Sequence, residues 1–225
     1  MKKIGLSLLA VGSLSACATG MTNQQMISRT VMQYPIETAM LNIYNKAYSD
    51  EVHALVDGQR VTVVTQVTPK GAMRFNNKSV QGAEVVTITK INDQIADKTV
   101  GINYFTLAPL VFHGFTSDIG EYSVTTQTTP IPKTAKIGDA STYLTEHVYS
   151  DSSQRKAINT YTQTWSLKQA SPATAWLCID NSENLLLSYD PEGTSTECYE
   201  INAKGEILAS NVTLNGDETI VFKSK

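Results

Sequence analysis

The spacing of apolar residues changes twice along the chain. Residues 4–14 are almost continuously apolar, residues 35–47 place apolar side chains at helical spacing, and most of the chain after residue 51 alternates apolar and polar positions. The helical stretch follows Pro35, and a proline is well suited to the first turn of a helix because its missing N–H is not needed there. We therefore expect one helix near residues 35–50.

The alternating part of the chain predicts a long series of short strands. The segment 159–167 shows this most clearly, because Tyr161, Gln163, Trp165 and Leu167 share one face while threonines and Ser166 occupy the other. The predicted strands span residues 52–56, 60–67, 85–91, 100–106, 121–128, 142–149, 159–167, 173–179, 185–189, 197–201, 207–214 and 219–223.

Turn residues separate these strands. Asp57-Gly58 suits the left-handed conformation of a tight hairpin, and Pro69-Lys70-Gly71 and Asn215-Gly216 are further turn signals. Short strands with a turn every 8–12 residues are typical of all-β domains. The sequence thus predicts a mainly β fold, an antiparallel meander that forms a sandwich or a partly closed barrel, with one N-terminal helix.

Residues 107–115, LAPLVFHGF, form the most apolar run after the N-terminal one. One interpretation is a core strand flanked by turns at Pro109 and Gly114. The other is an apolar surface, with Leu110, Phe112 and Phe115 in contact with acyl chains, a membrane or a partner.

The first 17 residues have the parts of an export signal. Lys2 and Lys3 precede an apolar stretch of about 11 residues, which is the length of a signal peptide and too short to span a bilayer. The stretch ends in Leu14-Ser15-Ala16-Cys17, which resembles the lipobox of bacterial lipoproteins at all four positions. The alternative is an ordinary secretory signal that happens to contain a cysteine.

The resemblance implies a processing route and a location. In bacterial lipoproteins a peptidase cuts before the cysteine, whose thiol carries a diacylglycerol and whose new amino group receives an acyl chain such as palmitate. Two or three chains anchor a protein stably. Ala18 stands where an aspartate commonly signals inner-membrane retention, so the resemblance implies the outer membrane, with the protein facing the periplasm. We expect a cleaved signal peptide (1–16), a lipidated Cys17 with a flexible tether (17–33) and one β-rich periplasmic domain (34–225).

Charge and cysteine content refine this picture. Loss of residues 1–16 removes two lysines and no acid, which leaves 16 basic residues against 21 acidic ones and changes the formal net charge from −3 to −5. An acidic chain is a poor match for nucleic acid. Cys178 and Cys198 remain, and an exported compartment favours their pairing over two buried thiols or a metal site.

The cysteines also constrain the topology. If the predicted strand 185–189 lay between the strands of Cys178 and Cys198, two strand spacings would separate the cysteines by nearly ~10 Å. A disulfide needs Cα atoms within about 7 Å. Either that strand is not inserted between them, or the sheet bends there.

Catalytic patterns are absent from the sequence. The histidines His53, His113 and His147 are far apart, and no metal-protease, serine-hydrolase or phosphate-binding motif occurs. We therefore expect no catalytic residue, metal or cofactor, although a hydrolase with an unrecognised site remains open. His147 follows Glu146 in a predicted strand, so the two side chains should point to opposite faces.

Two functions follow from the sequence. The first is a lipid-anchored envelope lipoprotein with a non-enzymatic domain that binds an envelope protein or has a structural role. The alternative is a carrier of lipid or another apolar ligand. One helix followed by a long antiparallel sheet is similar to the lipoprotein-carrier family of envelope half-barrels; the similarity is architectural and carries no functional residue with it.

Overall fold

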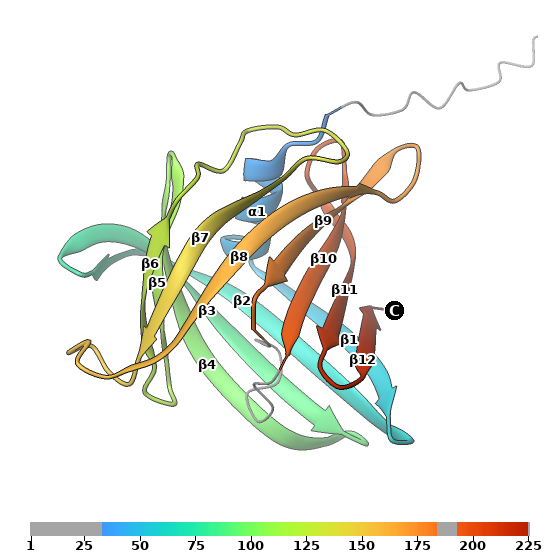
Figure 1. The fold of residues 1–225 in the computed structure, drawn as a ribbon, viewed down its shortest axis with the longest axis horizontal. Coiled ribbons are helices and arrows are strands. Elements are labelled where there is room, and N and C mark those ends of the chain that lie inside the picture. The colour runs from blue at the N-terminus through green and yellow to red at the C-terminus, as the bar shows by residue number, and fades with distance from the viewer. Residues whose placement is uncertain (1–32, 184–192, 225) are drawn as a thin grey trace, which may run out of the picture.

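The computed structural model describes residues 33–183 and 193–224. Its strands form one closed antiparallel barrel, in which each strand pairs with its neighbours in the sequence and the last strand returns to the first (Figure 1). The predicted antiparallel meander is confirmed, and its form is a closed barrel rather than a sandwich.

The elements follow one another without a crossover. They are α1 (Ile36–Tyr44), β1 (Tyr48–Val56), β2 (Gln59–Phe75), β3 (Lys78–Ile91), β4 (Gln94–Leu107), β5 (Leu110–Ser117), β6 (Tyr122–Gln127), β7 (Ala140–Tyr149), β8 (Ala157–Gln169), β9 (Thr174–Asn181), β10 (Thr194–Asn202), β11 (Ile207–Asn215) and β12 (Thr219–Ser224).

Helix α1 closes one end of the barrel from inside. Its apolar face, which includes Ile36, Met40 and Ile43, is fully or almost fully buried in a core with inward residues of the strands. The Asn42 side-chain amide donates to the Gly205 carbonyl over 2.8 Å, which ties the helix to the β10–β11 turn. The helix thus fills one end of the barrel.

The helix is shorter than the sequence predicts. It ends at Tyr44, and Tyr48 is already paired with Val67 across the β1–β2 ladder. Residues 48–50 therefore exchange helical hydrogen bonds for a strand ladder, an interaction with a distant segment that local spacing does not reveal.

The hairpin of β2 and β3 is longer than predicted. The expected turn at Pro69-Lys70-Gly71 is wrong, because β2 continues through it with only a shift of register. The missing N–H of Pro69 and the positive φ of Gly71 (76°) are both tolerated at such a bulge. The chain turns instead at Asn76-Asn77, both with positive φ.

The extended hairpin tip packs against the outside of the barrel. Phe75 stacks on Tyr104 and Tyr122, with ring centroids 4.2 and 5.2 Å apart. Together with Val80 these side chains form a small outer core. The outer core supports β4 and β6, whose inward faces belong to the lumen.

A second apolar cluster lies inside the barrel where β1, β2, β11 and β12 meet. It contains the valines 52, 61, 63 and 212 together with Leu214 and Phe222.

The alternation predicted for 159–167 is confirmed, since Tyr161, Trp165 and Leu167 are buried while Thr160 and Thr162 are exposed. In the part of the chain that the structure describes, no helix is long and apolar enough to span a membrane.

Candidate functional site: the barrel lumen

The two inner clusters do not fill the barrel. Between them lies a cavity of about 450 Å³. It is lined by inward residues of the strands and by the end of α1, and its rim includes Ser117, Ile119 and Glu121 of the β5–β6 connection. Volumes of 300–1,000 Å³ are usual for small-molecule sites.

The lining combines apolar walls with carboxyl groups. Valines, Leu144 and Phe112 supply apolar surface, and four tyrosines add aromatic surface with hydroxyl groups. Five lining residues carry a carboxyl group, namely Asp50, Glu121, Glu146, Glu183 and Glu197. No Lys, Arg or His belongs to the described lining. The cavity is therefore strongly acidic.

Glu197 points inward from β10, in phase with Tyr199 and Ile201. Burial raises the pKa of its carboxyl group, and hydrogen bonds from Tyr199 and Asn181 work against that increase. The Tyr199 hydroxyl donates to Glu197 Oε2 over 2.9 Å.

A chain of hydrogen bonds fixes this side of the lumen. The Gln163 amide donates to Asn181 Oδ1 over 2.8 Å, and the Tyr143 hydroxyl donates to Gln163 Oε1 over 2.6 Å. Asn181 in turn donates to Ser195 Oγ. These side chains come from β7, β8, β9 and β10, so the surroundings of Glu197 are ordered by four neighbouring strands.

Glu146 points inward from β7 and is 5% exposed. Its carboxylate accepts hydrogen bonds from the hydroxyls of Ser123 and Thr125, the latter over 2.6 Å. Burial raises the pKa of this carboxyl group, and the two hydroxyls work against the increase. His147 points outward to Thr160, as predicted for neighbours on a strand.

The Ser123 hydroxyl, which donates to Glu146, also links β5 to β6 where their backbone pairing is short. Described backbone pairing between β5 and β6 is limited to Thr116 with Tyr122. Ser123 Oγ accepts the Phe115 N–H over 2.6 Å while donating to Glu146. Gly114 permits this close approach, because a Cβ atom there would lie 2.2 Å from the Ser123 carbonyl oxygen.

The tyrosines of the lumen are neutral donors. Burial raises the pKa values of Tyr44, Tyr161 and Tyr199, and the nearby charge of Glu197 adds to the increase. Tyr44 also packs edge-on against Phe112, with ring centroids 4.9 Å apart. Neutral phenols can donate to a carboxylate but cannot balance its charge.

A second hollow of about 760 Å³ lies in the barrel wall beside α1. It is lined by residues of β1 and β11, and it shares Tyr48, Asp50 and Tyr199 with the lumen. The pairing of β12 with β1 is limited to Val52 and His53, so this ladder does not reach Tyr48. The side hollow therefore adjoins the lumen, and the two share part of their lining.

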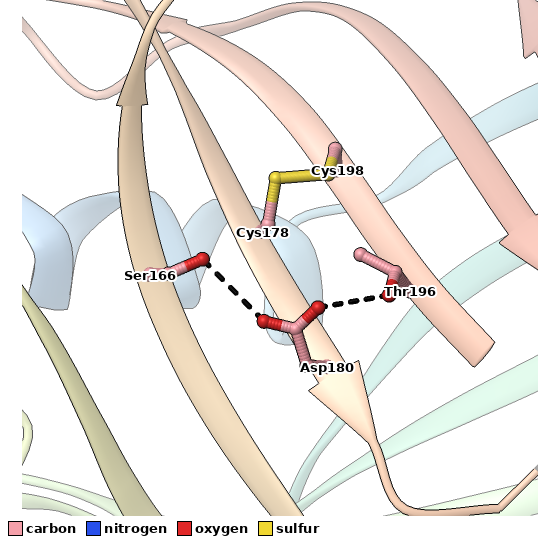
Figure 2. The surroundings of a disulfide bond; sticks show 5 residues. All are labelled: Ser166, Cys178, Asp180, Thr196 and Cys198. Atoms are coloured by element: carbon pink, nitrogen blue, oxygen red, sulfur yellow. Dashed lines mark hydrogen bonds between the residues drawn. A yellow bond between two sulfur atoms is a disulfide. The ribbon is translucent and has the colours of Figure 1, made fainter. Parts of the chain in front are cut away.

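The predicted disulfide is present, on the outer face (Figure 2). Cys178 of β9 lies directly opposite Cys198 of β10, with Cα atoms 4.0 Å apart. Asp180 beside it accepts hydrogen bonds from Ser166 and Thr196. Because β9 and β10 are direct neighbours, no strand is inserted between the cysteines. The predicted strand 185–189 lies outside the described residues.

The other predicted site residues lie in two places. Cys17, with residues 1–32, is outside the described part of the chain. Leu110 and Phe112 are buried, 1% and 8% exposed, and Phe115 lines the lumen. β5 is therefore a core strand, as in the first interpretation, and contact of Phe112 and Phe115 with an apolar molecule in the lumen stays a prediction. Leu110 and Phe112 point inward in one phase and Phe115 in the other, because the β4–β5 register shifts between Phe112 and Gly114.

Sequence reasoning missed Glu146 and Glu197 as site residues. Each occupies the inward phase of its strand, where Val148 and Tyr199 are its neighbours on the same face. The signal in the sequence was an acidic residue at a position where the alternation of the strand predicts an apolar one. Among the described residues, no group of three or more His, Cys, Asp or Glu side chains is placed to hold a metal ion.

Comparisons with known proteins leave this geometry as the basis for function. No protein-family model matches the chain, and no curated protein or solved structure matches it significantly.

Proposed function

We propose that the chain is a lipid-anchored protein of the bacterial envelope whose barrel binds a small molecule in its lumen. The anchor rests on the lipobox resemblance of residues 14–17. The binding function rests on one observation above all, the cavity of about 450 Å³ between the two inner clusters.

The cavity favours binding over a purely structural role. Protein interiors are normally packed as densely as organic crystals, with few voids larger than a water molecule. A barrel that served only as a rigid spacer would gain stability from filling its centre with apolar side chains. This barrel instead keeps carboxyl and hydroxyl groups around a hollow.

The hydrogen-bond partners of the two inner carboxyl groups favour binding over catalysis. Among the hydrogen bonds of the described residues, Glu146 accepts from Ser123 and Thr125 and Glu197 accepts from Tyr199 and Asn181, and neither bonds to a histidine or lysine. Their partners are hydroxyls and an amide that hold them in place. This arrangement suits recognition of a ligand, and the proposal is non-enzymatic.

A blocked lumen tests the binding function. Thr87 lines the cavity, whereas its neighbour Ile88 on β3 lies on the other face of the strand. The full-length protein, purified without denaturation from envelopes, should carry a co-purified small molecule visible by native mass spectrometry. Thr87→Trp should lose it and Ile88→Trp should keep it. A wild-type protein without any bound molecule, or equal occupancy in both variants, would contradict the proposal.

The anchor has an independent test. Cys17→Ser should abolish acylation and release the protein from membranes. If this variant stays with membranes through high-salt and carbonate washing, the lipoprotein interpretation is wrong.

A further inference from the structure

The charges in the lumen indicate which class of molecule it accepts. The described lining holds five carboxyl groups, and it has no basic side chain to neutralise them. Residues 184–192, which lie outside the described part of the chain, contain no Lys, Arg or His. Lys46 lines the adjoining side hollow together with Asp50, so the described lining leaves the inner carboxyl groups of Glu146 and Glu197 without a basic neighbour.

The two innermost carboxylates keep unused capacity to accept hydrogen bonds. A carboxylate offers about four acceptor positions. Glu146 uses positions for the hydroxyls of Ser123 and Thr125, and Glu197 uses positions for Tyr199 and Asn181. These donors are neutral, so they orient the carboxylates without balancing their charge.

Ligands of other charge fit this lining poorly. An anion would meet like charges on several sides of a site with reduced solvent screening. A neutral acyl chain would displace water from the carboxylates and give no hydrogen bond in return, which is costly for buried charged groups. A cation restores the electrostatic stabilisation and hydrogen bonds that the carboxylates lose when water leaves the cavity.

The walls fit the rest of such a ligand. Valines of β2 and β3 and Leu144 of β7 offer apolar contact to a carbon skeleton. Tyr44 and Tyr161 present aromatic rings in the same cavity, and aromatic faces attract ammonium groups. The cavity volume limits the ligand to a small molecule.

We propose that the lumen binds a small organic amine or quaternary ammonium compound, with its positive charge held by Glu146 and Glu197 and its carbon skeleton against the valine and tyrosine walls. This inference rests on the proposed binding function and names the class of ligand. Asp50 and Glu183, near the side hollow and the rim, extend the acidic lining toward the solvent.

A matched set of probes tests the class. For each of three carbon skeletons, phenylethyl, butyl and octyl, the amine, the alcohol and the carboxylic acid are titrated into the full-length protein by calorimetry at pH 7. Charge-assisted hydrogen bonds contribute about 1.5–3 kcal/mol, which corresponds to roughly tenfold to hundredfold in affinity. The amine should therefore bind at least about tenfold more tightly than the alcohol with the same skeleton.

Variants locate the charge. Glu197→Gln and Glu146→Gln should each weaken amine binding by about tenfold or more while leaving alcohol binding unchanged. Glu200→Gln is the matched control, because Glu200 lies on the opposite face of β10 and accepts a hydrogen bond from Thr174 on the outside. It should not change amine binding. Thermal melts check that each variant is folded.

The outcomes separate this inference from the proposed function. Equal or tighter binding of alcohols or acids, or no amine with a Kd below about 1 mM, would overturn the amine class. Whether Thr87→Trp loses the molecule that co-purifies with the wild-type protein would still decide the lumen function. Amine binding that survives Thr87→Trp would place the amine outside the lumen and overturn the inference.

Discussion

The disulfide gives the most quantitative prediction. Cys178 and Cys198 are separated by 20 positions, and the loop that they close includes the ends of β9 and β10. In the chain-entropy treatment, a cross-link that closes a loop of this length stabilises the folded state by about 3 kcal/mol at 25 °C. For a domain of about 200 residues, 1 kcal/mol shifts the melting temperature by roughly 2–4 °C.

Reduction should therefore lower the melting temperature by about 6–12 °C. Calorimetric melts of the protein with and without a thiol reductant measure the shift, and mass spectrometry after alkylation confirms that two further thiols have become free. The double variant Cys178→Ala with Cys198→Ala is the control, and its melting temperature should not respond to reductant. A shift below about 2 °C, with both thiols shown to be free, would show that the disulfide contributes far less than loop-closure entropy requires.

Three further predictions concern the lumen and its wall. Phe112→Ala should cost about 3–5 kcal/mol in urea unfolding, because it removes a buried ring from the core; a loss below about 1 kcal/mol would contradict that role. Glu197→Gln should raise the melting temperature of the ligand-free protein at pH 7 but not at pH 4. Burial raises the folded-state pKa of Glu197, so the stability it contributes is present below its unfolded pKa and lost as pH rises through the folded one; an equal effect at both pH values would exclude this cause. Gly114→Ala should destabilise the barrel strongly in chemical denaturation, because the new Cβ would lie 2.2 Å from a carbonyl oxygen at φ 139°. Gly216→Ala, which meets no atom within 4 Å, should have little effect.

Local patterns were enough to predict most strands and their faces. The alternation around Tyr161 and Trp165 identified the inward side correctly, because a strand exposes alternate residues to opposite faces. The tight turn at Asp57-Gly58 was also correct, and both residues have positive φ. The paired cysteines correctly pointed to an oxidised bridge.

Closure of the barrel and the hollow inside it could not be predicted. The first and last strands meet through Val52 with Ser224 and His53 with Lys223, contacts between segments about 170 residues apart that leave no local pattern. Alternation places Glu197 on the same face as Tyr199, but it does not tell whether that face is packed or hollow. The bulge at Pro69 and Gly71 was misread as a turn because the same residues suit both.

A crystal structure of the full-length protein with 2-phenylethylamine decides whether the lumen is a site for small organic amines. We expect electron density for the probe inside the barrel, with its ammonium group in contact with Glu146 or Glu197 and its ring against the tyrosines. A lumen that holds only water at saturating probe concentration, or a probe bound on the outer surface, would contradict this expectation.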